Sequence, residues 1–227
     1  MTSPLRRPVV VLISGRGSNM RRLIECGADP HSPYAVTKVF ADNPDAGGLA
    51  LARSLRTETQ ALRPGDFEDR AEYDSALADA IDQCAPALVL LAGFMRILSA
   101  GFVRRFEGRI MNIHPSLLPK FPGLNTHARA LAAQEREHGA TVHFVTAELD
   151  RGPLILQGRV PVEAGDDTIS LAARVLAVEH AMYPLAARWF CEDRLQQRDG
   201  RAWLDGKPLE LPLQLQDASA HARPQHA

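Results

Sequence analysis

The sequence of 227 residues is poor in cysteine, and this argues against disulfide-rich and zinc-stabilised classes of protein. Its 3 cysteines are Cys26, Cys84 and Cys191. They are widely spaced, with no Cys-x-x-Cys pair and no Cys/His cluster at the spacing of a zinc site. The pattern favours a reducing compartment, which we take to be the cytoplasm, and a chain without a metal.

The sequence also lacks an excess of charge of either sign and any long hydrophobic run. Its 26 Lys and Arg against 27 Asp and Glu give a net charge of -1, so electrostatics supply no reason to expect nucleic acid or an anionic membrane as partner. The longest apolar run, residues 87–94, is far too short to span a membrane. A shorter run at 9–13 ends in a glycine loop without a cleavage pattern, so we interpret it as a strand and not a signal peptide.

A glycine-rich loop follows this first strand, which we place at 8–13. Residues 14–19 read Ser-Gly-Arg-Gly-Ser-Asn, and a helix is expected after them, with Ser18 and Asn19 as candidate caps. The order strand, loop, helix offers backbone N–H groups and a positive helix end to an anion. Met20 stands where a dinucleotide site requires a third glycine, and the Gly-Lys-Ser/Thr of a P-loop is missing. Two interpretations stay open: a site for one phosphate, or a tight turn that needs glycine for its geometry alone.

A second polar feature lies at the end of a strand predicted at 110–114. Asn112 and His114 alternate with apolar residues, which places both side chains on one face, and Pro115 ends the strand. In open α/β sheets ligands bind at this carboxyl end. An amide that donates hydrogen bonds beside an imidazole that can give a proton suits a carbonyl gaining negative charge. The alternative is a polar residue near a strand end and a partly buried histidine that serves only structure.

A polar turn containing Asp150 follows a later predicted strand. A carboxylate near His114 would orient the imidazole and favour its protonated form. The sequence contains no Gly-x-Ser-x-Gly elbow and no cysteine in a reactive context. We therefore expect acyl transfer by direct attack of a substrate amine, without a covalent enzyme intermediate.

The hydrophobic pattern predicts an α/β fold. Strands and helices alternate in the first half, which indicates a parallel sheet. The strands at 141–146 and 154–162 lie too close together for a crossover helix and should be antiparallel, so the sheet is mixed. Strands are expected at 8–13, 34–41, 57–62, 87–92, 110–114, 141–146 and 154–162, helices at about 20–26, 49–55, 66–84, 100–106, 128–137 and 168–190, and a hairpin at 194–204.

The pattern also predicts how the chain is divided. We expect a single domain over 1–211, with a phosphate-binding half at about 8–106 and a catalytic half at about 107–206. From residue 212 to 227 the sequence is polar and without periodicity, so a disordered tail is expected. The sequence contains no internal repeats.

Six segments carry a resemblance to a known family: residues 12–19 (LISGRGSN), 91–98 (LAGFMRIL), 111–119 (MNIHPSLLP), 139–145 (GATVHFV), 148–153 (ELDRGP) and 179–184 (EHAMYP). Together they resemble the phosphoribosylglycinamide formyltransferases, the folate-dependent formyltransferases of purine synthesis. The likeness covers about residues 8–206. The Asn-Ile-His-Pro-Ser-Leu-Leu-Pro segment is shared by the wider group of folate formyltransferases, and its combination with Gly-x-Gly-Ser-Asn and Glu-His-x-x-Tyr-Pro is specific to this member.

The resemblance implies a Rossmann-like formyltransferase fold and an activity. The formyl group of 10-formyltetrahydrofolate would pass to the amine of N1-(5-phospho-D-ribosyl)glycinamide, here called glycinamide ribonucleotide. The products would be formylglycinamide ribonucleotide and tetrahydrofolate, in the synthesis of inosine monophosphate. The expected partners are these small molecules, with no metal, nucleic acid or membrane, and the family includes dimers, so a homodimer stays open.

The resemblance also implies residue roles. Without it, Arg70 would be interpreted as a solvated helix charge and Glu179 as a surface carboxylate. With it, catalysis falls to Asn112, His114 and Asp150, the substrate phosphate to the loop N–H groups of Gly17, Ser18 and Asn19, the glycinamide-ribose part to Glu179, and the folate to Arg70, Met95, Arg96, Ile97, Leu98, Asn112, Thr146, Ala147, Glu148, Leu149 and Asp150.

Three other functions would leave different features in the sequence. Methionyl-tRNA formyltransferase would carry an added tRNA-binding domain and more positive charge, whereas this chain is near neutral and extends little beyond residue 211. Formyltetrahydrofolate hydrolase would carry an extra N-terminal regulatory domain, whereas the first strand is expected at residue 8. A non-catalytic binding protein would have no need of Asn112, His114 and Asp150 together.

Overall fold

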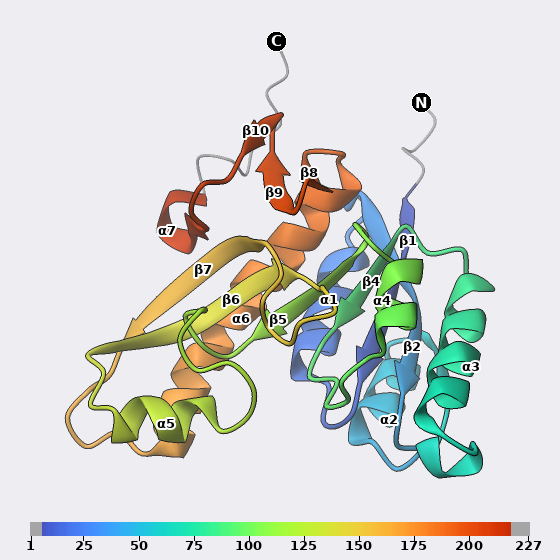
Figure 1. The fold of residues 1–227 in the computed structure, drawn as a ribbon, viewed down its shortest axis with the longest axis horizontal. Helices are drawn as coiled ribbons and strands as arrows, with labels where there is room; N and C mark the ends of the chain where they lie inside the picture. Colours follow the sequence, from blue (N-terminus) through green and yellow to red (C-terminus); the bar gives the residue numbers. More distant parts are fainter. Residues whose placement is uncertain (1–5, 219–227) are drawn as a thin grey trace.

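An eight-stranded mixed sheet forms the centre of the computed structural model, which describes residues 6–218 (Figure 1). The strand order is β11-β7-β6-β5-β4-β1-β2-β3. Strands β3, β2, β1, β4 and β5 are parallel, whereas β6 is antiparallel to both β5 and β7, which confirms the predicted mixed sheet. The strands are β1 (Arg7–Ile13), β2 (Tyr34–Ala41), β3 (Glu58–Ala61), β4 (Leu88–Leu91), β5 (Ile110–His114), β6 (Glu137–Phe144), β7 (Leu154–Pro161) and β11 (Leu213–Gln214).

Helices cover both faces of the sheet, and each face has its own core. Val9 and Val11 of β1 pack in the core of one face with α1, α2 and α6, while Val10 and Leu12 pack in the core of the other with α3 and α4. Burial on both faces explains why β1 is a continuous apolar run. The helices are α1 (Ser18–Gly27), α2 (Gly47–Ser54), α3 (Arg70–Asp82), α4 (Ala100–Arg105), α5 (Thr126–Ala132), α6 (Thr168–Cys191) and the 3-10 turn η1 (Pro64–Asp66).

The helix expected over 128–137 is shorter than predicted. Helix α5 ends at Ala132, and Gln134 takes a φ of 52°, in the left-handed region that ends helices. Strand β6 then begins at Glu137, which pairs with Pro161 of β7. Glu137, the last residue that the local pattern assigned to the helix, therefore belongs to a strand.

The C-terminal region contains one confirmed prediction and one correction. The hairpin is present as β8 (Leu195–Arg198) and β9 (Arg201–Leu204), and β10 (Lys207–Pro208) extends it to a three-stranded sheet. The expectation of disorder from residue 212 is wrong for 213–218, where β11 adds to the edge of β7 and α7 (Leu215–Ala218) follows. Residues 219–227, also part of that expectation, lie outside the described residues. Between residues 6 and 218, no helix has both the length and the apolar character needed to cross a membrane.

The topology defines where a ligand can enter. Strand β1 lies between β2 and β4, so the chain moves outward from β1 in both directions. A crevice forms at the carboxyl ends of the strands, at the point where the order of strands along the sheet reverses. The glycine loop after β1, the loop 93–98 after β4 and the polar end of β5 all lie at that edge.

Candidate active site

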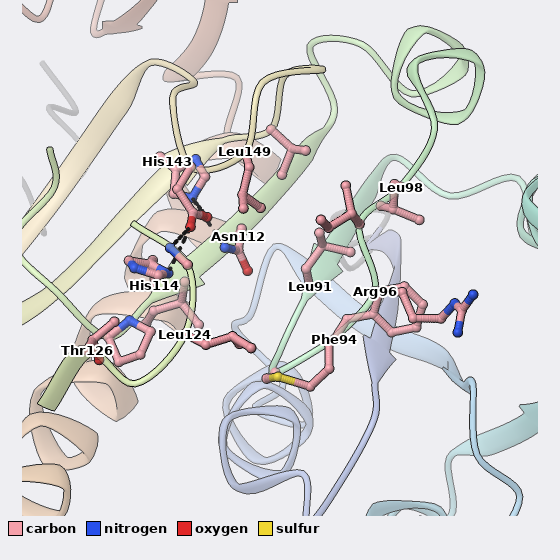
Figure 2. Close-up of a pocket in the computed structure, with 18 of the residues that line it drawn as sticks. Leu91, Phe94, Arg96, Leu98, Asn112, His114, Leu124, Thr126, His143 and Leu149 are labelled. Carbon is pink, nitrogen blue, oxygen red and sulfur yellow. Dashed lines mark hydrogen bonds and ion pairs between the residues drawn. The ribbon is translucent and has the colours of Figure 1, made fainter. Parts of the chain in front are cut away.

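A cavity of about 560 Å3 opens at the carboxyl ends of β4 and β5. Its walls are the loop 93–98, the end of β5 with Pro115, the loop 123–127 and the turn 145–150. Asn19 of α1 and Glu179 of α6 complete the lining. Figure 2 shows the polar side chains Asn112, His114 and His143 gathered on one side of the cavity, and Leu91, Phe94 and Leu98 on the other.

The amide of Asn112 is oriented by a histidine that sequence analysis did not single out. Asn112 and His143 are direct partners in the antiparallel β5–β6 pair, and Asn112 Nδ2 lies 3.2 Å from His143 Nε2. His143 Nδ1 lies 2.8 Å from the Phe144 carbonyl oxygen, which can only accept, so Nδ1 carries the proton and Nε2 accepts from Asn112. Burial lowers the pKa of His143 to about 4, so this neutral form persists at neutral pH. The strand alternation Val142-His143-Phe144 was the signal that could have revealed it.

His114 is held between two acceptors. Its Nε2 lies 2.9 Å from the Phe121 carbonyl oxygen, and its Nδ1 lies 3.5 Å from Asp150 Oδ2. His114 is 6% exposed, so water cannot substitute freely for either partner. Because a carbonyl and a carboxylate both accept, the arrangement is satisfied when both ring nitrogens carry protons.

Asp150 joins the turn after β6 to the loop after β5. Besides facing His114, its Oδ2 accepts a hydrogen bond of 2.8 Å from the Gly123 N–H. Its Oδ1 lies 3.8 Å from His143 Nε2, too far for a hydrogen bond. Asp150 takes a φ of 53°, in the left-handed region, which is a strained conformation for a residue with a side chain. Its contacts to two loops hold it there.

Residues of the loop 121–125 also adopt left-handed backbone conformations. Phe121, Gly123 and Asn125 have φ values of 54°, 76° and 57°. Arg129 of α5 fastens the loop by donating from Nη1 to the Pro122 carbonyl oxygen at 2.6 Å, and its guanidinium lies 5.4 Å from the centre of the Phe121 ring. The Phe121 carbonyl is thereby fixed beside His114.

The glycine loop leads into α1 as predicted, but its cap differs from the expectation. Gly17, with a φ of 74°, is the N-cap, and neither Ser18 nor Asn19 makes a capping hydrogen bond, so that part of the prediction is wrong. The first N–H groups of a helix have no partner within it. Gly48 of α2 packs against this loop and donates from its N–H to the Gly15 carbonyl oxygen at 3.0 Å.

The Asn19 side chain instead faces α6. Its Nδ2 donates to Glu179 Oε2 at 2.6 Å, while its Oδ1 is buried and has no hydrogen-bond partner among residues 6–218. Asn19 and Glu179 are 8% and 6% exposed. Burial raises the pKa of Glu179 to about 7, although the hydrogen bond from Asn19 acts in the opposite direction. Glu179 is therefore not the surface carboxylate that its sequence context suggested.

The loop 93–98 presents apolar side chains and backbone groups. Met95 and Ile97 are 64% and 57% exposed, and the exposed Leu124 and Leu149 also line the cavity. The Met95 N–H donates to Ser14 Oγ at 2.8 Å, which ties this loop to the glycine loop. Apolar side chains exposed together at a cavity mark a place for an apolar or aromatic ligand group.

Most of the predicted site residues come together, and three do not reach the cavity. Gly17 and Ser18 lie in the glycine loop outside its lining. Arg70 donates to the Ile97 carbonyl oxygen and pairs with Asp74 at 3.8 Å, so it supports the loop 93–98 from outside the lining. The predicted residues that line the cavity are Asn19, Met95, Arg96, Ile97, Leu98, Asn112, His114, Thr146, Ala147, Glu148, Leu149, Asp150 and Glu179.

Comparison with known proteins identifies the class. A family model described as formyl transferase matches residues 7–187, and the chain therefore belongs to the formyl transferase family. Within it, the chain is similar to proteins named phosphoribosylglycinamide formyltransferase. It is 50% identical to that of Escherichia coli (strain K12) over 201 residues, which cover 88% of this chain and 95% of the relative. It is 41% identical to that of Haemophilus influenzae over 203 residues, which cover 89% and 96%.

Solved structures agree with the sequence relatives. The phosphoribosylglycinamide formyltransferase of Coxiella burnetii matches with a TM-score of 0.88 and 43% identity, over 92% of this chain and 99% of that one. Glycinamide ribonucleotide transformylase 1 of Symbiobacterium toebii matches with a TM-score of 0.85 and 41% identity, over 88% and 94%. The expected formyltransferase fold and the expected class of formyl-transferring enzyme are both confirmed.

Proposed function

We propose that this enzyme transfers the formyl group of 10-formyltetrahydrofolate to the amine of glycinamide ribonucleotide, in the cytoplasm, as a step of purine synthesis. The observation that carries the proposal is the cluster of Asn112, His114 and Asp150 at the wall of one cavity. The relatives named above support the choice of substrate. The neutral amine attacks the formyl carbon, and the formyl oxygen gains negative charge as the tetrahedral intermediate forms.

Asn112 is assigned to the oxyanion. Its amide has two N–H groups, and one is taken by His143 Nε2. That contact fixes the rotation of the amide and leaves the second N–H free for the formyl oxygen. A donor already oriented before the reaction stabilises a developing charge without reorganising, and losing one such donor costs about a hundredfold in kcat.

His114 is assigned as the proton donor beside the same oxygen. Asp150 balances the positive charge of the imidazolium. In the absence of substrate, the Phe121 carbonyl oxygen accepts the hydrogen bond from the Nε2–H group. The formyl oxygen must therefore share or displace that carbonyl. A proton then passes from the attacking amine to N10 of the leaving folate, while His114 and Asn112 hold the oxyanion.

Glycinamide ribonucleotide is assigned to the glycine loop and to the end of the cavity lined by Asn19 and Glu179. The backbone N–H groups of Gly17, Ser18 and Asn19 bind the phosphate of glycinamide ribonucleotide, because a helix start with a glycine cap is suited to an anion. The unpartnered Asn19 Oδ1 and the Glu179 carboxylate offer acceptors to the hydroxyl and N–H donors of the glycinamide-ribose part.

The folate is assigned to the other end. Its aromatic part packs on the exposed Met95, Ile97 and Leu149, and its pterin binds backbone groups of 95–98 and 146–150. Arg96 also lines this end, with its guanidinium 5.0 Å from the centre of the Tyr73 ring. Arg70 acts on the folate through the Ile97 carbonyl that it holds.

The first test measures release of tetrahydrofolate from 10-formyltetrahydrofolate by ultraviolet absorbance, with and without glycinamide ribonucleotide. We expect release that requires the nucleotide and falls by about a hundredfold or more in His114→Ala. His31→Ala, which removes an exposed histidine far from the cavity, should keep the parent rate. Release without any amine would indicate a hydrolase, and folate binding without release would indicate a binding protein; either result would overturn the proposal.

A further inference from the structure

One buried hydroxyl touches both strands that carry the site. Tyr183 of α6 is fully buried, and its hydroxyl lies 2.9 Å from the Leu91 carbonyl oxygen and 3.0 Å from the Met111 carbonyl oxygen. Both oxygens are acceptors, so the hydroxyl donates its single proton to a three-centre hydrogen bond. Burial raises the pKa of Tyr183 well above its usual range, so the hydroxyl keeps that proton.

Each of the two carbonyls belongs to a residue next to a part of the site. Leu91 is the last residue of β4, directly before the loop that begins at Ala92 and forms one wall of the cavity. Met111 is the residue before Asn112, and its peptide group sets where the Asn112 side chain starts. In the parallel β4–β5 pair, Leu91 and Asn112 are register partners. The hydroxyl therefore joins the two strands at residues next to the wall of the cavity.

Tyr183 comes from the helix that also supplies Glu179. The two residues are four positions apart on α6, so they lie on the same side of the helix, one turn apart. Glu179 reaches the cavity and Tyr183 reaches the strands below it. One helix thus connects Glu179, which lines the cavity, with the strand that carries Asn112.

We propose that Tyr183 is a positioning residue for formyl transfer, which fixes Asn112 relative to the loop 93–98 through its shared hydrogen bond to Met111 and Leu91. The inference rests on the proposed function, because it gives Asn112 a place in the reaction. Catalytic groups must be held within about 0.5 Å of their productive geometry, and a hydroxyl bound to both strands supplies that restraint. The residue does not touch substrate, so its removal should affect the rate of reaction and not substrate affinity.

The test compares Tyr183→Phe with Tyr34→Phe. Tyr34 is a matched control, because it is equally buried and its hydroxyl also donates to a backbone carbonyl, that of Leu23 at 3.3 Å, away from the cavity. Assays are run below the melting temperatures of all variants. We expect both variants to lose thermal stability, but only Tyr183→Phe to lose kcat, by about tenfold, with KM values within about twofold of the parent.

A double-mutant cycle asks whether Tyr183 acts through Asn112. In an Asn112→Ala background, Tyr183→Phe should lower kcat by less than about twofold, because the group that it positions is gone. Additive effects on kcat, or a Tyr183→Phe enzyme that melts early but keeps the parent kcat, would overturn the inference. If the parent itself transfers no formyl group, the proposed function fails instead, so the two failures are distinguishable.

A second approach covers the case in which Tyr183→Phe does not fold. The sequence has 3 tyrosines, so in a Tyr34→Phe/Tyr73→Phe enzyme Tyr183 is the one that remains. Ring-fluorinated tyrosine supplied during growth then makes the Tyr183 hydroxyl a stronger donor while keeping its shape. A kcat changed by about twofold or more at unchanged KM supports the inference, and a kcat equal to that of the unlabelled enzyme overturns it.

Discussion

Glu179 is a carboxylate in a place where its charge is poorly solvated. Its folded-state pKa of about 7 lies above that of an exposed glutamate, so the folded protein holds a proton that the unfolded chain loses at lower pH. The resulting stabilisation is complete below about pH 4.5 and is lost as the pH rises through about 7. The loss amounts to about 3 kcal/mol at most, which is the cost of burying the charged form.

Glu179→Gln should remove this pH dependence. Glutamine can still accept from Asn19, and it carries no charge to desolvate. Urea unfolding at several pH values should give a variant more stable than the parent above about pH 7, while its KM for glycinamide ribonucleotide rises. Glu68→Gln, at an exposed position, serves as the control. An unchanged slope of stability against pH in Glu179→Gln would contradict the assignment.

At the residue scale, sequence patterns identified the side chains of the site but not their hydrogen-bond partners or protonation states. The alternation in β5 correctly placed Asn112 and His114 together, since the period of a strand is fixed by the backbone. The role of His143 depends on its register opposite Asn112 and on burial, and neither can be read from one strand alone. Asn19 was assigned through its position in the loop, whereas its side chain turns to Glu179, which is 160 positions away.

Helix α2 supports the glycine loop through a glycine of its own. A Cβ on Gly48 would lie 2.9 Å from the Gly15 carbonyl oxygen and 2.4 Å from Ile13 Cδ1, so the loop would have to shift. Gly47→Ala is a matched control, because a Cβ on the neighbouring Gly47 would have no atom within 4 Å. The two glycines lie in the same first turn of α2, so their helix propensities are comparable.

Gly48→Ala should therefore weaken binding at the loop. We expect a KM for glycinamide ribonucleotide raised by about tenfold with kcat and the KM for folate nearly unchanged, since a loop displaced by a few tenths of an ångström misaligns its N–H groups. Steady-state kinetics with each substrate varied in turn makes the comparison. Equal KM values in Gly47→Ala and Gly48→Ala would show that the contact does not shape the nucleotide site.

Strands were predicted correctly where they are buried over several residues, because burial is then visible in the sequence as a run of apolar residues. Strands β1 and β4 are buried on both faces and read as continuous apolar runs. Prediction failed for β11, which is two residues long and too short to display a period. It also failed at the end of α5, where Gln134 takes a left-handed conformation that the local apolar pattern does not reveal.

At the scale of the whole molecule, the site depends on contacts between segments far apart in the chain. Asp150 reaches His114 because β6 pairs with β5 and the turn after β6 folds back across the pair to the His114 side chain. The sequence predicted that β6 and β7 are antiparallel, but it did not predict that β6 pairs with β5. Among the left-handed residues of the loop 121–125, Gly123 and Asn125 are of types that favour this conformation, but Phe121, whose carbonyl meets His114, has no such sequence signal.

The C-terminal segment protects the sheet at its exposed edge. Strand β11 pairs with β7, Arg159 of β7 donates to the Gln214 side chain at 2.9 Å, and Ala218 is fully buried. Leu213 and Leu215 are partly buried against the main core. An unpaired edge strand exposes backbone N–H and C=O groups that can pair with another chain.

A chain ending at Pro212 should therefore be less stable and prone to self-association. Losing the partial burial of two leucines costs about 2 kcal/mol, which lowers the melting temperature by about 4–8 °C in a chain of this size. The control is a chain ending at Ala218, which keeps β11 and α7, so the two chains differ only in residues 213–218. Scanning calorimetry and light scattering over a range of concentrations make the comparison. Below the transition, kcat should stay within about twofold, because residues 213–218 do not line the cavity. Equal melting temperatures and equal particle sizes in the two chains would mean that β11 adds nothing to the edge of the sheet.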